Sequence, residues 1–354
     1  MHTKTSLVIT TINSPNQILH ELSCGGASRG WDVVIVGDRS SPRNFHIEGS
    51  RYFSLDKQRE LPFQLAGSCP ERHYTRKNLG YLIAMQAGAT LIVETDDDNA
   101  PLSNFWSSRP LSCVVPTCSA PGWVNVYRYF TDDMQIWPRG FALNHLLDPA
   151  VPMEALEKIN VIAPIRQSLA NESPDVDAIH RLVFGGVHDF LPDRLVALGR
   201  NVWCPFNSQN TMCWHAAYPL LYLPATCSFR ATDILRSYVA QRILWENNWS
   251  LLFESPTMIQ HRNEHDLMKD LSDEVVIYRL AGEIARQLSD LPLRSGGCWI
   301  MDNILRCYEV LEKLGTVSSD EMRLLNHWLS DVATVWTPDE GSVVLHNLGE
   351  TEKG

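Results

Sequence analysis

Three consecutive carboxylates, Asp96, Asp97 and Asp98, are the residues of this chain best suited to chemistry. They follow an apolar run at residues 91–93, which predicts a short buried strand. Carboxylates side by side repel one another and lose solvation when buried, whereas a hard divalent cation with oxygen ligands removes that cost. Ligands of open α/β sheets bind at the carboxyl ends of strands. The pattern therefore favours a cation site over a solvated acidic loop.

Two further strands are expected to bring polar groups to the same edge of a sheet. Residues 31–38 have a continuous apolar core, which suits a parallel strand covered on both faces. Asp38 at its end is well placed for a ribose or base edge, and a turn carboxylate bonded to its own backbone is the alternative. Residues 6–12 predict another strand, and we expect Thr11 and Asn13 at its end to contribute to the same nucleotide site.

Residues 75–87 predict a helix that leads into the acidic strand and completes a β-α-β unit. Arg76 and Lys77 lie in its first turn, where cations oppose the helix dipole, and Asn78 follows them. An anion at the helix N-terminus would make this arrangement favourable. We therefore expect a phosphate site there, with an ordinary basic surface patch as the alternative.

A clear amphipathic helix is predicted after Thr232, which is a suitable N-cap. Asp233 in its first turn is a candidate general base for an attacking hydroxyl, and a carboxylate that only stabilises the helix dipole is the alternative. Residues 260–265 are rich in groups that bind metals and phosphates. His261 is a candidate to complete a metal shell and Arg262 to bind a diphosphate, with a plain loop as the alternative.

The remaining patterns concern the fold. Residues 123–128 alternate as in a strand. Asp175 and Asp177 favour the first turn of a helix, and they also suit acceptor-sugar binding. From about residue 266 the pattern is helical, over residues 275–288, 302–314 and 319–329.

Composition limits the classes of protein and partner. The 354 residues are 44% hydrophobic and 20% charged, which is ordinary for a soluble globular protein. The net charge of -11 argues against nucleic acid as a main partner. Nine scattered cysteines without a Cys-x-x-Cys pair predict reduced thiols. With neither a signal peptide nor a transmembrane segment in view, we expect a cytoplasmic protein, in which any membrane association would come through a partner or a surface patch.

Several short strings in order resemble the STELLO-type glycosyltransferases, a family first catalogued as a domain of unknown function. The matching strings are residues 93–101, 124–127, 136–140, 174–179, 205–210, 228–230 with 233–234, and 260 with 262–263. The resemblance implies a GT-A type α/β fold that binds a nucleotide sugar, with a mostly parallel central sheet flanked by helices. We expect a glycosyltransferase domain over residues 1–270. The helical pattern beyond it predicts an extension over residues 271–354 that packs on the core or makes contacts with partners.

Roles for single residues follow from this resemblance. Asp96 and Asp98 are similar in place to the metal-binding pair of an Asp-x-Asp motif, with Asp97 between them on the nucleotide side. Asp38 is similar in place to the acid that holds the nucleoside. In the same way, Arg76 and Asn78 resemble the pair facing the diphosphate, and Asp233 resembles the catalytic base of inverting members of the fold.

We therefore expect a glycosyltransferase that depends on Mn²⁺ or Mg²⁺. Its donor would be a nucleoside diphosphate sugar, UDP- or GDP-linked, and its acceptor a hydroxyl of a glycan, a lipid-linked sugar or another compound. The cation would stabilise the charge on the departing diphosphate. If the transfer retains stereochemistry, Asp233 would orient the acceptor instead of acting as a base. The alternatives are a nucleotide-sugar mutase, a nucleotidyltransferase, or a non-catalytic scaffold that assists a polysaccharide synthase.

Overall fold

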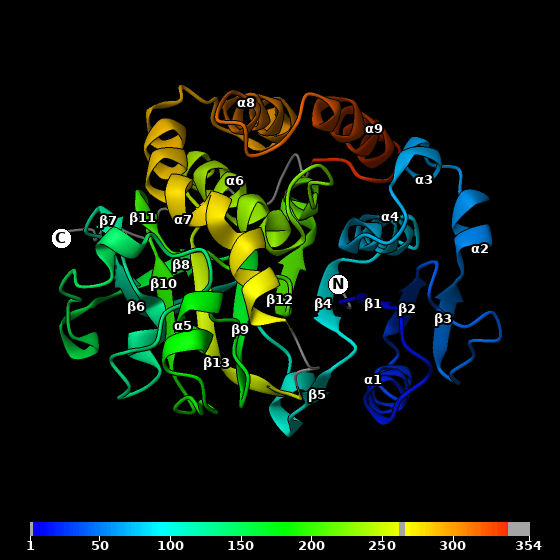
Figure 1. The fold of residues 1–354 in the computed structure, drawn as a ribbon, viewed down its shortest axis with the longest axis horizontal. Helices are drawn as coiled ribbons and strands as arrows, with labels where there is room; N and C mark the ends of the chain where they lie inside the picture. Colours follow the sequence, from blue (N-terminus) through cyan, green and yellow to red (C-terminus); the bar gives the residue numbers. More distant parts are fainter. Residues whose placement is uncertain (1–2, 262–265, 339–354) are drawn as a thin grey trace, which may run out of the picture.

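A large mixed β-sheet forms the centre of the molecule in the computed structural model, which describes residues 3–261 and 266–338 (Figure 1). The strand order is β3-β2-β1-β4-β12-β9-β13-β10-β6-β8, and β5 pairs with β13 outside this path. The short strands β7 and β11 pair separately. The strands are β1 Thr5–Thr11, β2 Asp32–Gly37, β3 Ser50–Phe53, β4 Leu91–Asp96, β5 Asn99–Pro101, β6 Ser112–Cys118, β7 Gly122–Trp123, β8 Glu157–Ile162, β9 Ile165–Asn171, β10 Leu195–Leu198, β11 Val202–Trp203, β12 Asn210–Trp214 and β13 Leu251–Gln260.

Helices cover both faces of this sheet and one side of the molecule (Figure 1). The α-helices are α1 Gln17–Ala27, α2 Leu55–Arg59, α3 Gln64–Ser68, α4 Lys77–Gln86, α5 Ala178–Val183, α6 Thr232–Glu246, α7 Leu267–Asp290, α8 Ile300–Lys313 and α9 Asp320–Val335. The 3-10 helices used below are η1 Tyr74–Arg76, η3 Val126–Tyr129, η6 His215–Leu221 and η7 Phe229–Ala231.

The N-terminal strands are parallel and buried on both faces, as their continuous apolar runs predicted. β1 pairs in parallel with β2 and β4, and β2 pairs in parallel with β3. In β1, Val8 packs into the larger core on the α4 side, whereas Leu7 and Ile9 pack into a second core with residues of α1. The polar residues at the ends of β1, β2 and β4 are therefore brought to one edge of the sheet.

The expected α/β fold is confirmed, but parallel pairing dominates only in this N-terminal half. β12 is antiparallel to both β4 and β9, and β10 is antiparallel to β13. Parallel pairs remain between β9 and β13 and between β6 and β10. Hydrophobic patterning reports burial but not strand direction, so the sequence could not distinguish the two halves.

Two local predictions are corrected. The strand expected at residues 123–128 is limited to β7, because the chain turns into η3 and buries Val126 and Tyr127 side by side. Thr232 is the first residue of α6 and not its N-cap, since its hydroxyl donates to the carbonyl oxygen of Ser228 at 3.3 Å. Asp177 is the N-cap of α5, where its carboxylate accepts from the backbone N–H of His180 at 2.8 Å.

The C-terminal helices pack on the rest of the chain. Figure 1 shows α8 and α9 along one side of the molecule, over α6 and α4. Trp328 of α9 is fully buried, and its indole N–H donates to the carbonyl oxygen of Pro219 at 3.1 Å. The domain boundary expected after residue 270 falls inside α7. Among the described residues, none of the helices combines the length and the apolar character needed to span a lipid bilayer.

Candidate active site

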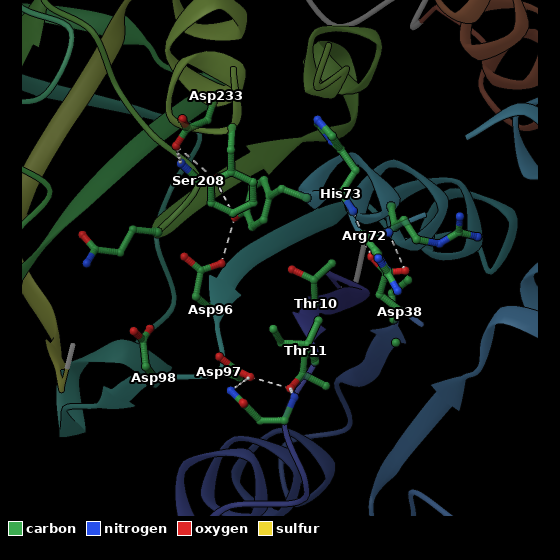
Figure 2. A pocket seen from close by; sticks show the side chains of 18 of the residues that line it. Thr10, Thr11, Asp38, Arg72, His73, Asp96, Asp97, Asp98, Ser208 and Asp233 are labelled. Carbon is green, nitrogen blue, oxygen red and sulfur yellow. Dashed lines mark hydrogen bonds between the residues drawn. The ribbon is translucent and has the colours of Figure 1, made fainter. Parts of the chain in front are cut away.

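A cavity of about 860 Å³ opens where β1, β2 and β4 end. Its walls come from these strand ends, from the loop before α4, and from Ser208, η7 and the first turn of α6. Figure 2 shows Asp38 and Asp98 on opposite sides of Asp96, with Ser208 and Asp233 beyond Asp96. The sequence-predicted residues that line the cavity are Thr11, Asn13, Asp38, Arg76, Asp96, Asp97, Asp98, Asp175 and Asp233.

Asp96 is balanced by a lysine of the chain itself. The Nζ atom of Lys77, which is fully buried, lies 2.9 Å from Oδ1 of Asp96, and the Tyr74 hydroxyl donates to the same oxygen at 2.8 Å. Lys77 also donates to the carbonyl oxygen of Ser208 at 3.3 Å. Burial raises the pKa of Asp96, and the charge of Lys77 opposes that rise. The idea that only an external cation makes the acidic cluster tolerable is therefore wrong for Asp96.

Asp97 is held by residues at the end of β1. Its Oδ2 atom accepts from Nδ2 of Asn13 at 2.9 Å and from the Thr11 hydroxyl. Its backbone carbonyl accepts from Nδ2 of Asn16, the N-cap of α1, at 2.9 Å. The structure thus brings Thr11, Asn13 and Asp97 together at the cavity wall, where their hydrogen bonds fix the turn between β4 and β5.

Asp98 carries a buried oxygen without a hydrogen-bond partner in the described part of the chain. Its Oδ2 accepts from Nε2 of Gln260 at 3.2 Å, but its buried Oδ1 has no hydrogen bond to a described residue, and neither does the buried Oε1 of Gln260. Burial, followed by the charges of Asp96 and Asp97, raises the pKa of Asp98 to about 7. Buried polar atoms are normally satisfied. Two orphan oxygens on one cavity wall match the hard-oxygen donors that Mg²⁺ and Mn²⁺ take.

The structure does not bring His261 into this set. Its backbone N–H donates to the carbonyl oxygen of Asp98 at 3.0 Å, but its ring is turned to Glu172, with Nδ1 and Oε2 3.2 Å apart. The ring is about half exposed and does not line the cavity. Arg262 lies outside the described residues. Within the described part of the chain, no three His, Cys, Asp or Glu residues are arranged to hold a metal.

Asp38 anchors the loop before α4. Its two carboxylate oxygens accept from the backbone N–H groups of Arg72 and His73, each at 2.9 Å (Figure 2). Arg72 has a φ of 55°, in the left-handed region that non-glycine residues adopt only when held. Asp38 therefore lines the cavity as expected and also fixes the shape of the opposite wall. Asp38 also accepts from the backbone N–H of Arg39 at 2.7 Å, which is the local bond expected of a turn carboxylate.

The basic first turn of α4 binds protein groups. The Arg76 guanidinium donates to Oε1 of Gln58 at 2.7 Å and to the carbonyl oxygen of Cys69 at 3.0 Å. The Asn78 amide both donates to and accepts from the backbone of Leu223, each at 2.9 Å, and it does not line the cavity. The hydrogen-bonding groups of Arg76 and Asn78 named here are therefore bound by other parts of the protein. Asn78 is thus a link between α4 and the segment after η6, and the pair expected to face a diphosphate is reduced to Arg76.

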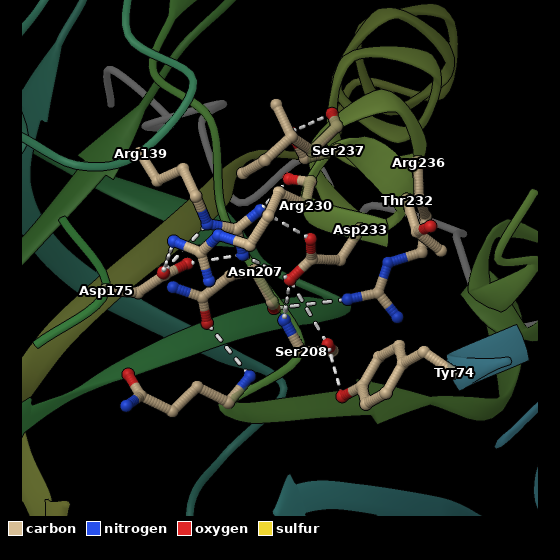
Figure 3. Close-up of polar contacts among 12 residues, drawn as sticks. Tyr74, Arg139, Asp175, Asn207, Ser208, Arg230, Thr232, Asp233, Arg236 and Ser237 are labelled. Atoms are coloured by element: carbon tan, nitrogen blue, oxygen red, sulfur yellow. Dashed lines mark hydrogen bonds and ion pairs between the residues drawn. The ribbon is translucent and has the colours of Figure 1, made fainter. Parts of the chain in front are cut away.

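Asp233 lies at the cavity but is fully engaged. Both of its oxygens accept from Arg139 at 2.9 Å, and Oδ2 also accepts from the backbone N–H and hydroxyl of Ser208 at 3.2 Å (Figure 3). Burial raises its pKa, but the charge and hydrogen bonds of Arg139 outweigh burial and lower the pKa to about 2. A carboxylate held ionised in this way accepts a proton poorly at neutral pH. The geometry favours positioning over proton transfer.

Arg139 organises the end of the cavity near α6, a role that sequence reasoning did not assign. Nε and Nη2 donate to the carboxylate of Asp175 at 2.8 and 2.7 Å, and the remaining N–H groups donate to Asp233 and to the carbonyl oxygen of Arg230. All five donors are thereby used. The close approach of this loop to α6 depends on Gly140, which has a φ of 85° and where a Cβ atom would overlap Cγ2 of Ile234.

A second buried ion pair fixes the acidic strand against α6. Nη2 and Nη1 of Arg236 lie 2.7 and 3.0 Å from the two carboxylate oxygens of Glu94, and both side chains are almost fully buried. Glu94 stands two residues before Asp96, and Arg236 stands three residues after Asp233. The pair therefore sets the position of one side of the cavity relative to the other.

The resemblance to the STELLO glycosyltransferases is confirmed by comparison with known proteins. The family model described as STELLO glycosyltransferases matches residues 230–338. Two curated proteins of Arabidopsis thaliana are each 26% identical to the chain: "Probable glycosyltransferase STELLO2" over 87% of the chain and "Probable glycosyltransferase STELLO1" over 93%. These alignments cover 42% and 44% of the plant proteins, so the chain spans less than half the length of these relatives.

Solved structures give only a distant likeness. Glucosyl-3-phosphoglycerate synthase from Mycobacterium tuberculosis, solved in complex with Mg²⁺ and UDP, is 12% identical with a TM-score of 0.36, over 82% of this chain and 80% of that one. A crystal structure of a mycobacterial protein is 11% identical, also with a TM-score of 0.36, over 82% of this chain and 76% of that one. A likeness at this level carries no argument about fold or function.

Proposed function

We propose that the chain is a glycosyltransferase of GT-A type that transfers a sugar from a nucleoside diphosphate sugar to a hydroxyl acceptor with the help of Mg²⁺ or Mn²⁺. The observation that carries the proposal is the pair of buried orphan oxygens, Oδ1 of Asp98 and Oε1 of Gln260, on the wall of a cavity at the carboxyl ends of parallel strands. The similarity to proteins named as glycosyltransferases supports the same reading.

The cation would be held by Asp98 and Gln260, with Asp96 beside them. When bound, it supplies the positive charge that stabilises the departing diphosphate. Lys77 holds the Asp96 carboxylate by an ion pair at 2.9 Å and opposes the rise in its pKa that burial causes. Lys77 balances the negative charge of one of the three aspartates. The two negative charges that remain match the double positive charge of the cation.

The nucleoside would lie at the opposite end, between Thr11 and Asp38. Asp38 and the loop at Arg72 and His73 form a wall that is rigid before the ligand arrives, since three hydrogen bonds of 2.7–2.9 Å fix this carboxylate. Such preorganisation lowers the ordering cost of binding. Asp97, held by Thr11 and Asn13, keeps the strand ends in register beneath the diphosphate.

Transfer breaks the bond between the anomeric carbon and the diphosphate oxygen and forms a bond to the acceptor oxygen. The acceptor proton passes to the departing diphosphate, which keeps the electron pair of the broken bond. Arg139 holds Asp233 ionised in its ion pair, so we assign Asp233 to positioning Ser208 and the acceptor and not to the removal of this proton. The Ser208 hydroxyl lies 2.6 Å from the Tyr74 hydroxyl, which donates to Asp96. The position of Asp233 is thereby linked to that of Asp96.

The proposal is tested by incubating the purified chain with UDP- and GDP-sugars and Mn²⁺ or Mg²⁺ and analysing the products. Slow donor hydrolysis that releases free sugar and nucleoside diphosphate, and stops on chelation, is the expected result. Release of pyrophosphate would indicate a nucleotidyltransferase, and an isomerised nucleotide sugar without release would indicate a mutase. No reaction, together with no nucleotide binding in a thermal-shift screen, would favour a scaffold.

A further inference from the structure

One buried donor at the cavity makes no hydrogen bond to any residue that the structure describes. Arg230 in η7 lines the cavity and is 8% exposed, and its Nε donates to Oε1 of Glu274 at 2.8 Å. The donor is its Nη2 atom, which is buried and has no hydrogen-bond partner among residues 3–261 and 266–338. A buried guanidinium nitrogen without an acceptor is costly. The position of Arg230 is fixed by Glu274, so this nitrogen stays at the cavity and cannot turn to solvent.

The nearest carboxylate does not satisfy this nitrogen. Nη2 of Arg230 and Oδ1 of Asp175 are 3.8 Å apart, which is beyond hydrogen-bond distance (Figure 3). Asp175 is held by Arg139 and cannot approach further without breaking bonds of 2.7 and 2.8 Å. A hydroxyl group beside the two atoms would accept from Nη2 and donate to Oδ1, because a hydroxyl can do both at once.

The charges around this gap favour a neutral ligand. Three carboxylates, Asp175, Asp233 and Glu274, share the two guanidinium groups of Arg139 and Arg230 in one buried network. Carboxylates thus outnumber cations, so a phosphate or carboxylate of a ligand would meet net negative charge in a poorly solvated place. A hydroxyl carries no such penalty.

An exposed aromatic ring lines the same cavity. Phe229, the neighbour of Arg230 in η7, lines the cavity and is 53% exposed, which is unusual for a large apolar side chain. Its ring packs edge-on against Tyr74, with centroids 5.8 Å apart, and this contact leaves much of the ring open. The apolar C–H face of a pyranose ring is the natural partner of an exposed aromatic face that lies next to polar groups.

We propose that Phe229, Arg230 and Asp175 form an acceptor subsite for an uncharged sugar. The sugar ring lies on Phe229, and one hydroxyl lies beside Nη2 of Arg230 and Oδ1 of Asp175, which are 3.8 Å apart, and is hydrogen-bonded to both. The proposal rests on the proposed glycosyltransferase function and names its acceptor class. It makes Arg230 and Phe229 binding residues for the acceptor and gives them no part in holding the donor.

The test measures the binding of neutral and acidic forms of the same sugars. Methyl glycosides of glucose, galactose, mannose and xylose, with the methyl uronides of glucose and galactose, are titrated into the full chain and followed by saturation-transfer NMR. Phe229→Ala removes the stacking face. Arg230→Lys keeps a cation for Glu274 but removes the Nη2 atom that faces Asp175. Phe184→Ala is the matched control, because Phe184 is also exposed but does not line the cavity.

At least one neutral glycoside should bind, with a lower Kd than its uronide. Arg230→Lys should raise that Kd roughly tenfold and Phe229→Ala about fivefold, whereas Phe184→Ala should leave it unchanged. Tighter binding of the uronides, equal binding by wild type and both cavity variants, or no binding of any glycoside would overturn the proposal. Phe229 is a surface residue, so its variant stays informative if Arg230→Lys fails to fold.

The donor site is followed in the same samples by the thermal shift with UDP or GDP and Mn²⁺. This shift should persist in both cavity variants. A shift without glycoside binding would end the acceptor proposal and leave the glycosyltransferase proposal standing. The absence of the shift in wild type would count against the glycosyltransferase proposal itself.

Discussion

Lys77 reduces the net negative charge of the cluster formed by Asp96, Asp97 and Asp98. A lysine in the first turn of a helix looks like part of a surface patch, yet here its ammonium is fully buried against Asp96. The ion pair joins residues 19 apart in the sequence, and Tyr74 and Ser208 complete the shell around Lys77. The charge of the cluster is thereby reduced before any ligand binds.

Lys77→Met should lower the free energy of unfolding by about 3 kcal/mol, because it leaves Asp96 charged and poorly solvated. Urea unfolding of the variant measures this. The double variant Lys77→Met with Asp96→Asn should recover part of the loss, since the uncompensated charge is gone. A loss below about 1 kcal/mol in the single variant would show that Asp96 is solvated well enough without its partner.

Asp177 provides a pH test at the scale of one carboxyl group. Burial is the main cause that raises its pKa, to about 6, although it accepts from His180 and Trp137. Between pH 4 and 6 the folded state therefore holds a proton that the unfolded chain has lost, so the contribution of Asp177 to stability falls as pH rises through this window. Asp177→Asn keeps the helix cap but removes the titration.

The difference in unfolding free energy between wild type and Asp177→Asn should accordingly change by about 1 kcal/mol per pH unit from pH 4 to 6, in favour of the variant. Urea titrations at pH 4, 5, 6 and 7 give the comparison. The titration of His180, whose pKa is lowered by burial, is common to both proteins and cancels. Parallel curves across the window would mean that the pKa of Asp177 is not raised.

At the scale of elements, the cavity depends on the close approach of the loop before Gly140 to α6. Gly140 has positive φ, and Ile234 fills the space that a Cβ atom would need. The contact places Arg139 against Asp233 in the first turn of the helix. The loop and the helix are 94 residues apart in the sequence at this contact, so only the folded chain reveals it.

Gly140→Ala should lower the free energy of unfolding by about 3 kcal/mol, because it adds a steric clash to backbone strain. Gly186→Ala is the matched control: its φ of 88° is similar, but nothing lies within 4 Å of the added carbon. The control should lose about 1 kcal/mol. If both variants lose the same free energy of unfolding, the loop before Gly140 moves easily away from Ile234 and its contact with α6 is not tightly packed.

Element prediction from sequence worked where burial alone decides the element. The strand ahead of Asp96, the strand ahead of Asp38 and the helix after residue 76 all occur, and the residues at their ends meet at one cavity. Partners were not predictable, because Asn78, Arg76 and Asp233 are engaged by groups distant in sequence. Patterning reports which side chains are buried and does not report what they meet.

At the scale of the whole molecule, the C-terminal helices are tied to the preceding part of the chain by buried carboxylates. Asp331 of α9 accepts from the backbone N–H groups of Gln64 and Leu65, each at 2.8 Å, at the start of α3. Glu321 is fully buried and accepts from the backbone N–H groups of Ala225 and Thr226 at 3.0 and 2.7 Å. We propose that residues 271–338 fold together with the preceding part.

Glu321→Ala should lower the free energy of unfolding by about 3 kcal/mol, since several buried donors lose their acceptor. Far-UV circular dichroism and tryptophan fluorescence should still report one coincident transition. Glu309→Ala, on the exposed side of α8, should stay within about 0.5 kcal/mol of wild type. Two separate transitions would instead support an independent C-terminal domain.

The central claim is that Asp98 and Gln260 hold a divalent cation that joins a nucleoside diphosphate to the chain. Calorimetric titration of UDP and GDP into wild type, Asp98→Asn and the exposed control Asp56→Asn, each with and without Mn²⁺, tests it most directly. We predict binding of at least one nucleotide that is at least tenfold tighter with Mn²⁺ in wild type and Asp56→Asn and loses this gain in Asp98→Asn. Mn²⁺-dependent binding of equal strength in Asp98→Asn, or no effect of Mn²⁺ on either nucleotide in wild type, would contradict it.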